Sequence, residues 1–168
     1  MKVLKVWITV KEALECDMRR VPCHKEEVKK MIKEDCIFCK IAKGEIPSAT
    51  IYESNDFKCI LDVAPANKGH ALIIPKEHSD NIFDLDAEMA AKVFSFATIA
   101  ARAIKEETGC DGLNIVQNNG EAAGQTVNHF HMHIIPRFKG DDVNVKWKQL
   151  ETESEAQNEL AKAIKKRL

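Results

Sequence analysis

Short runs of β-branched and aromatic residues mark strands in the first half of the sequence. Residues 50–53 (TIYE) and 57–61 (FKCIL) are two such runs, and the Ser54-Asn55-Asp56 stretch between them has the chemistry of a tight turn. These segments therefore predict a β-hairpin. Three further apolar runs predict the other strands of a five-stranded sheet: Ala71–Ile74, Leu113–Gln117 and Asn128–Ile135.

The spacing of apolar residues changes to a helical period between Asp86 and Thr108. Apolar side chains recur there every three or four residues, and Gly109 follows as a stop signal, so one long helix is predicted. A short N-terminal helix is predicted over 35–44, with Asp35 as its capping residue. A last amphipathic helix is predicted over 153–166, with four apolar residues turned inward: Ala156, Leu160, Ala161 and Ile164.

This order of elements indicates an α+β domain in which one long helix packs on a mostly antiparallel sheet. The domain and its C-terminal helical tail are predicted over residues 35–168, and residues 1–34 are predicted to form an N-terminal extension. Two interpretations of the extension stay open. Either it packs on the domain, or translation starts at Met31, because Lys25-Glu26-Glu27 can be encoded by a purine-rich ribosome-binding sequence.

Composition and charge narrow the classes of partner. The 168-residue chain carries 25 basic and 26 acidic side chains, a formal net charge of −1, so it offers no basic face to a nucleic acid. No apolar run approaches the ~20 residues of a membrane span, and the N-terminus lacks the pattern of a signal peptide. We therefore expect a soluble, cytoplasmic protein. In that reducing compartment, Cys36 and Cys39 indicate a metal or redox pair rather than a disulfide.

The sharpest chemical feature is a run in which His129, His131 and His133 alternate with apolar residues. On a strand, a two-residue spacing directs all three imidazoles to one face and the apolar residues to the other. A single buried histidine is usually a hydrogen-bonded core residue. Three on one face are hard to explain as packing, because each brings two ring nitrogens that need partners. The pattern therefore predicts a catalytic face.

This stretch, His129-Phe-His131-Met-His133-Ile-Ile, resembles the signature of the histidine-triad (HIT) family in full. Four upstream blocks are similar to the family's other motifs and come in the same order: residues 38–48, 61–62, 69–78 and 118–127. The resemblance covers about residues 35–140. It implies a HIT-like fold and a nucleotide hydrolase of the Hint-like phosphoramidase branch.

The resemblance implies that His131 is the nucleophile, and a neutral imidazole is a good attacking group at neutral pH. Its other ring nitrogen should then donate to an oriented acceptor. By the same resemblance, His133 and Thr126 are expected to contact the phosphate or the leaving group. Substrate contacts are also implied for three residues upstream: Asn118, Gly124 and Gln125.

At the other end of the nucleotide, Asp62 resembles the family's carboxylate that accepts both ribose hydroxyls. A turn residue at a strand end would explain this Asp equally well. Ile46 is expected to form a wall of the base pocket, although an Ile before Pro is more often part of the core. The implied substrate is a purine nucleotide. The sequence does not place His70.

A structural zinc site is implied at Cys36, Cys39, His78 and His129, the four positions that the zinc-bearing part of the family would use. Such a site would clip the N-terminal helix to the catalytic strand and hold His131 in register. The alternative is a pair of reduced cysteines on a short helix. The spacing of Cys16, Cys23 and His24 fits no standard zinc pattern.

These features predict hydrolysis of nucleoside 5′-phosphoramidates or related nucleotides through a covalent nucleotidyl-histidine intermediate. Magnesium is not required, because backbone amides, Thr126 and the flanking histidines can balance the phosphate charge. Two alternatives stay open: a dinucleoside polyphosphate hydrolase, and a nucleotide-binding regulatory protein whose hydrolysis is incidental. The family is commonly dimeric through its long helix and sheet edge, so a homodimer is expected.

Overall fold

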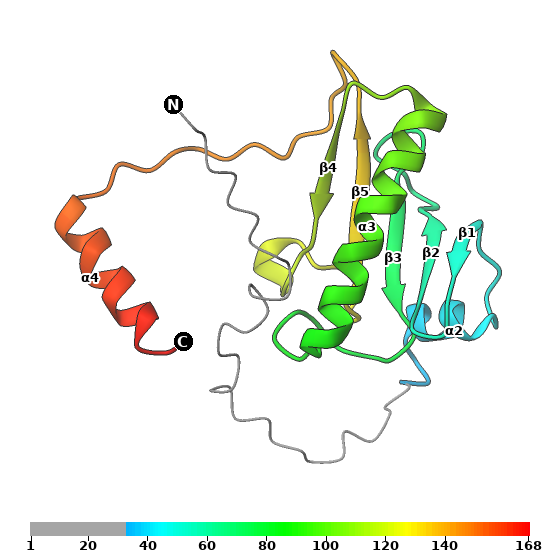
Figure 1. The fold of residues 1–168 in the computed structure, drawn as a ribbon, viewed down its shortest axis with the longest axis horizontal. Coiled ribbons are helices and arrows are strands. Elements are labelled where there is room, and N and C mark those ends of the chain that lie inside the picture. The colour runs from blue at the N-terminus through cyan, green and yellow to red at the C-terminus, as the bar shows by residue number, and fades with distance from the viewer. Residues whose placement is uncertain (1–32) are drawn as a thin grey trace, which may run out of the picture.

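The computed structural model describes residues 33–168 and begins its regular structure with a short helix. The predicted extension, residues 1–34, lies almost wholly outside the described residues, so both interpretations of it stay predictions. Among residues 33–168, none of the helices combines the length and the apolar character needed to cross a membrane. The elements then follow in the predicted order (Figure 1).

The centre of the molecule is a five-stranded antiparallel sheet with the strand order β1-β2-β3-β5-β4. It confirms the predicted α+β fold class, and the hairpin of β1 and β2 lies at the predicted residues. In the register between β3 and β5, Leu72 lies opposite His133. The strands are β1 (Thr50–Glu53), β2 (Phe57–Leu61), β3 (Ala71–Pro75), β4 (Gly112–Val116) and β5 (Met132–Arg137).

One face of the sheet is covered by the long helix α3 (Ala87–Thr108), as Figure 1 shows. The Asp86 side chain accepts hydrogen bonds from the first amides of the helix, and Gly109 ends it in the left-handed conformation with a φ of 67°. The predicted stop signal therefore sets the C-terminal end, and the Asp86 cap sets the start. The core between α3 and the sheet is built from apolar residues of both layers, among them Val93, Ala97, Ile104, Ile73, Met132 and Ile134.

The other face of the sheet is covered by the short helix α2 (Ile37–Lys43). Its N-cap is Cys36 and no side chain caps it, so the prediction that Asp35 caps this helix is wrong by one residue. Gly44, with a φ of 81°, closes the C-terminus as expected. A second core cluster joins the helix to the sheet: Phe38, Ile41, Ile60, Leu72 and Ile74.

The strand that was predicted from Asn128 begins only at Met132. His129 and His131 lie in the segment that leads into β5, because the Phe130 N–H donates to the Ser79 carbonyl rather than to a neighbouring strand. The alternation of side chains nevertheless holds. Phe130, like Met132 and Ile134, packs in the core under α3.

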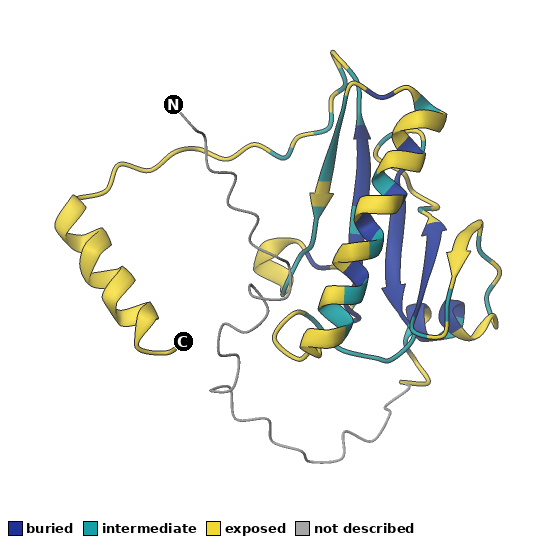
Figure 2. Cartoon of the chain, viewed as in Figure 1, coloured by how far each residue is buried: buried dark blue, intermediate teal, exposed yellow. Residues whose placement is uncertain are grey.

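The C-terminal helix α4 (Ser154–Lys165) forms where it was predicted, but its apolar side is not buried. Residues 144–153 have no regular secondary structure, and Figure 1 shows α4 standing away from the sheet. The prediction that Ala156, Leu160, Ala161 and Ile164 turn inward is therefore wrong within this single chain. All four are exposed, which Figure 2 shows as an exposed surface along the whole helix.

Candidate functional site

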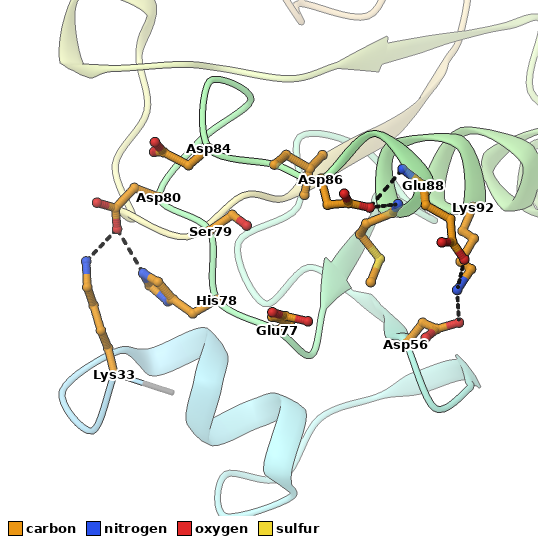
Figure 3. A pocket seen from close by; sticks show the side chains of 12 residues that line it. Lys33, Asp56, Glu77, His78, Ser79, Asp80, Asp84, Asp86, Glu88 and Lys92 are labelled. Atoms are coloured by element: carbon orange, nitrogen blue, oxygen red, sulfur yellow. Dashed lines mark hydrogen bonds and ion pairs between the residues drawn. The ribbon is translucent and has the colours of Figure 1, made fainter. Parts of the chain in front are cut away.

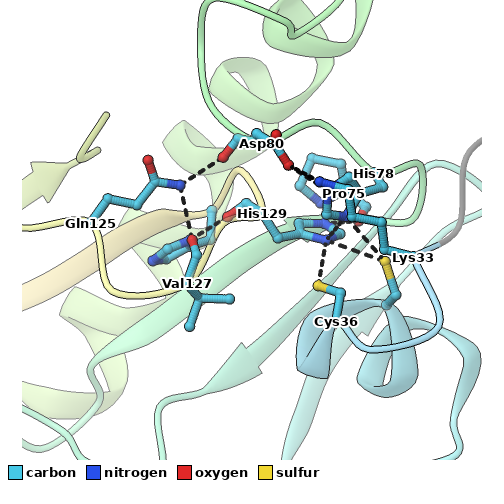
Figure 4. A network of polar contacts seen from close by, with 10 residues as sticks. Lys33, Cys36, Pro75, His78, Asp80, Gln125, Val127 and His129 are labelled. Carbon is cyan, nitrogen blue, oxygen red and sulfur yellow. Dashed lines mark hydrogen bonds and ion pairs between the residues drawn. The ribbon is translucent and has the colours of Figure 1, made fainter. Parts of the chain in front are cut away.

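Two cysteines and two histidines from three parts of the chain meet on the α2 side of the sheet. Cys36 and Cys39 come from the start of α2, His78 follows β3, and His129 precedes β5. The Cys39 Sγ lies 3.3 Å from the His78 Nδ1 and 3.5 Å from the His129 Nδ1, and the two Nδ1 atoms are 3.1 Å apart. The Cys36 Sγ lies 3.4 Å from the His129 Nδ1 (Figure 4). We call this group the Cys/His cluster.

Each histidine of the Cys/His cluster donates a hydrogen bond from its Nε2–H. Its Nδ1 therefore carries no proton, and the Nδ1 lone pair points toward the centre of the cluster. The His129 Nε2–H donates to the Pro75 carbonyl at 2.9 Å, and the His78 Nε2–H donates to the Asp80 Oδ1 at 2.8 Å. Burial lowers the pKa of His129 to about 4, so the ring is neutral at physiological pH. Hydrogen bonds to Lys33 and His78 hold the pKa of Asp80 below its ordinary value, so this acceptor is ionised.

The donor set of the Cys/His cluster fits a tetrahedral metal ion. Zinc takes thiolate and neutral imidazole ligands at about 2.0–2.3 Å, which places neighbouring ligand atoms roughly 3.3–3.8 Å apart. All four ligand atoms lie within 4.8 Å of one another, and Cys39 and His129 are buried. Burial also raises the pKa of the Cys39 thiol, so a thiolate at this position needs a cation beside it.

The middle histidine, His131, is buried beside the Cys/His cluster and held by one hydrogen bond. Its Nδ1–H donates to the His129 carbonyl at 2.7 Å, which leaves Nε2 as the nitrogen with a lone pair. The ring packs edge-on against Phe38, with the ring centres 4.9 Å apart. Burial lowers the pKa of His131 below its ordinary value, so the ring is a neutral base.

The third histidine is paired with a residue that the sequence did not place. The His70 Nδ1 accepts a hydrogen bond from the Ala66 N–H at 3.0 Å, so its Nε2 carries the proton and donates to the His133 Nδ1 at 2.9 Å. His133 is thereby fixed with its own proton on Nε2. Burial lowers the pKa of His133 to about 4, so this proton belongs to a neutral ring. The only sequence signal for His70 was its place in a family block.

Asp62 lies at the end of β2 beside this histidine pair. Its Oδ2 lies 3.6 Å from the His70 Nε2, and its Oδ1 accepts the Ala64 N–H at 2.9 Å. The second contact is the turn contact that the alternative interpretation required. The other oxygen, Oδ2, faces the histidines, so it remains free to accept a hydrogen bond from a ligand. Both interpretations of Asp62 therefore remain compatible with its position.

The loop over residues 118–126 joins β4 to the segment that leads into β5. We call it the phosphate loop, because the family resemblance implies substrate contacts there. Gly120 and Gly124 have φ angles of 83° and 82°, a conformation that favours glycine. The Asn118 side chain donates to the Gly124 carbonyl at 3.3 Å and so ties the two ends of the loop together. Thr126 is exposed at its end. Gln125 is buried and bonded to protein groups, so its expected contact with substrate stays a prediction.

Ile46 packs beside α2 against the second core cluster and is partly buried. Its position suits the core interpretation, and the residue stays only a candidate for the wall of a base pocket. An open hollow of about 740 Å³ is lined in part by His78 and Asp80 (Figure 3). Its carboxylates make it unsuitable for a phosphate. They belong to Asp56, Glu77, Asp80, Asp84, Asp86 and Glu88.

Residues 43–140 match the family model of the HIT domain. The chain is 49% identical over 116 residues to the protein hit of Bacillus subtilis, and the aligned region covers 68% of this chain and 80% of that protein. It is 44% identical over 102 residues to the adenosine 5′-monophosphoramidase hnt1 of Schizosaccharomyces pombe, over 61% of this chain and 74% of that protein.

The fold is shared with solved structures of comparable identity. The structure of SMU.412c from Streptococcus mutans superposes with a TM-score of 0.79 at 42% identity, over 83% of this chain and 88% of that chain. A zinc-bound histidine triad family protein from Mycobacterium smegmatis superposes with a TM-score of 0.63 at 38% identity, over 77% of this chain and 97% of that chain.

Proposed function

The chain belongs to the HIT family, and we propose that it is a hydrolase of purine nucleoside 5′-phosphoramidates or related nucleotides with an activated α-phosphorus. The observation that carries the proposal is the tautomer of His131. Because its Nδ1–H is committed to the His129 carbonyl, a neutral Nε2 is left to attack phosphorus. The similarity to the S. pombe phosphoramidase supports the choice of substrate class.

The proposed reaction is a double displacement at phosphorus. The His131 Nε2 forms a bond to the α-phosphorus while the bond to the leaving amine breaks. The His133 Nε2–H, which the His70 hydrogen bond orients, donates a hydrogen bond to the departing nitrogen, and the amine leaves with a proton taken from solvent water. Water then attacks the phosphorus while the bond to the His131 Nε2 breaks. The attacking water loses its proton to solvent, the nucleoside monophosphate is released, and His131 returns to its neutral form. His70 acts through His133 and is a positioning residue.

The phosphate charge is proposed to be balanced by protein groups. Gly124 allows backbone amides to approach phosphate oxygens closely, and the Thr126 hydroxyl and Asn118 lie at the same loop. Together with the His133 Nε2–H these donors would stabilise the charge that develops at phosphorus. Magnesium is therefore not required by this mechanism.

The proposed ribose contact gives a first prediction. Asp62→Asn should weaken AMP binding more than 2′-deoxy-AMP binding, by about 1–3 kcal/mol, because one acceptor for the ribose hydroxyls is lost. Asn keeps an oxygen that can accept the Ala64 N–H, so the turn is preserved. Dissociation constants from calorimetry measure the difference. An equal loss for both sugars would reduce Asp62 to a turn residue.

The Cys/His cluster is proposed to hold a structural zinc ion, with Cys36, Cys39, His78 and His129 as its ligands. The donor chemistry supports this proposal, as does the zinc-bound relative. A bound ion would supply a crosslink between α2, the segment after β3 and the segment before β5.

A homodimer is proposed through the outer face of α3 and the edge strand β4. Large apolar side chains are exposed on these two elements, namely Phe94, Ile99 and Ile115, and exposed side chains of this kind are typical of an interface. Light scattering that gave the mass of a single chain would contradict this proposal.

The substrate class is tested by turnover of adenosine phosphoramidate against diadenosine polyphosphate. We expect faster hydrolysis of the phosphoramidate and, after rapid quenching, a chain whose mass is increased by one adenylyl group. Preference for the diadenosine compound would instead favour a dinucleoside polyphosphate hydrolase. Absence of turnover with retained AMP binding would instead favour the regulatory alternative.

A further inference from the structure

The segment that follows His78 lies between the Cys/His cluster and the phosphate loop and is bonded to both. The Ile82 N–H donates to the Asn119 Oδ1 of the phosphate loop at 2.8 Å, and the Ser79 carbonyl accepts the Phe130 N–H of the segment that leads into β5 at 2.6 Å. The segment therefore has two neighbours of different chemistry, a candidate metal centre and a candidate phosphate site.

Asp80 connects the segment to the Cys/His cluster through its side chain. Its Oδ1 accepts the His78 Nε2–H at 2.8 Å, which turns the Nδ1 of that ring toward the cluster (Figure 4). A carboxylate behind a ligand histidine fixes its tautomer and orientation, and loss of such a partner typically weakens metal binding about 10–100-fold. Lys33 bonds to the same oxygen at 2.5 Å and holds the carboxylate in place (Figure 3).

The same residue connects to the phosphate loop through its main chain. The Gln125 Nε2 donates to the Asp80 carbonyl at 2.6 Å and to the Val127 carbonyl at 2.9 Å, while the Gln125 Oε1 accepts the Gly120 N–H at 2.7 Å. The side-chain amide is thus satisfied on both its donor and its acceptor side. Gln125 is only 7% exposed, so water does not compete freely for these bonds.

We propose that Asp80 and Gln125 form a bridge that couples metal binding at the Cys/His cluster to nucleotide binding at the phosphate loop. This proposal rests on the proposed function, which supplies the metal and the nucleotide. A ligated His78 holds the Asp80 side chain, and the Asp80 carbonyl holds Gln125, which in turn fixes the Gly120 end of the loop. Loop amides fixed in this way are preorganised for phosphate, so each ligand should strengthen the binding of the other.

Thermodynamic linkage gives the test, because such a coupling must be the same in both directions. With the full chain, calorimetry measures AMP binding to zinc-loaded and to chelator-treated protein, and chelator competition measures zinc binding with and without saturating AMP. We expect AMP to bind at least about fivefold more tightly to the zinc-loaded protein, and zinc to gain by the same factor from AMP.

The bridge itself is tested by Gln125→Ala, which should still bind both ligands but with a coupling factor near one. Asp84→Ala is the matched control, because Asp84 is exposed and lines the acidic hollow together with Asp80, but its side chain makes none of the bridge contacts. This variant should keep the wild-type coupling factor. If Gln125→Ala does not fold, Asp80→Ala replaces it. That variant keeps the main-chain carbonyl, and it should bind zinc more weakly and show a smaller factor.

The outcomes separate the bridge from the function on which it rests. Zinc-loaded and metal-free protein that bind AMP equally would overturn the bridge alone, and so would Gln125→Ala or Asp80→Ala with the full wild-type factor. A wild-type chain that binds no zinc would overturn the metal centre and the bridge together. A chain that binds no AMP would overturn the proposed function as well.

Discussion

Replacing His131 by alanine is expected to lower the turnover rate at least about 1,000-fold, while the affinity for AMP stays within a few fold of wild type. The loss is large because the variant has no nitrogen to attack phosphorus, and water must replace a positioned nucleophile. Binding should survive because the proposed contacts to ribose and phosphate lie on other residues. Single-turnover kinetics with adenosine phosphoramidate and calorimetry with AMP measure the two quantities.

The covalent intermediate provides the control for this prediction. Wild-type protein quenched during turnover should carry an adenylyl group on His131, located by mass spectrometry of the peptide, and the alanine variant should carry none. His133→Asn should instead form the adduct slowly, because it loses the imidazole donor to the leaving group and keeps the nucleophile. A His131→Ala protein that retained several per cent of wild-type turnover would rule out His131 as the nucleophile.

Local signals in the sequence were sufficient for the elements whose ends are set by their own residues. Helix α3 lies over the residues that its apolar spacing predicted and ends at the predicted Gly109, and the hairpin lies at the predicted residues. Where a contact between residues far apart in the chain sets the end of an element, the sequence was less informative. The bond from the Phe130 N–H to the Ser79 carbonyl delays the start of β5, and no local pattern encodes it.

The candidate site shows the same division. The three histidines and the two cysteines are visible as a spacing, because each set is local in the chain. His70 pairs with His133 only because β3 and β5 are neighbours in the sheet, which the sequence does not specify. Helix α4 was predicted to bury its apolar side, and amphipathic periodicity cannot say whether the covering surface lies in the same chain.

Loss of the metal is expected to lower stability and activity together. In Cys39→Ser, the buried position between His78 and His129 would hold a hydroxyl, a poor zinc ligand, so the purified protein should contain much less than the one zinc per chain expected of wild type. The binding free energy of a structural zinc is also folding free energy. A loss of about 3 kcal/mol would lower the Tm by roughly 6–12 °C in a chain of 168 residues.

Activity should fall with the Tm because His129 is both a proposed ligand and the residue whose carbonyl holds the His131 Nδ1–H. Wild-type protein stripped by a chelator should behave like Cys39→Ser and recover when zinc is returned, which separates metal loss from the substitution itself. Cys23→Ser is the control, because the spacing of Cys23 fits no zinc pattern, and this variant should keep the metal, the Tm and the turnover.

Metal analysis, calorimetry and single-turnover kinetics measure the zinc content, the Tm and the turnover. Zinc-free protein with unchanged Tm and turnover would reduce Cys36 and Cys39 to ordinary helix cysteines, and the case for His131 would stand without them.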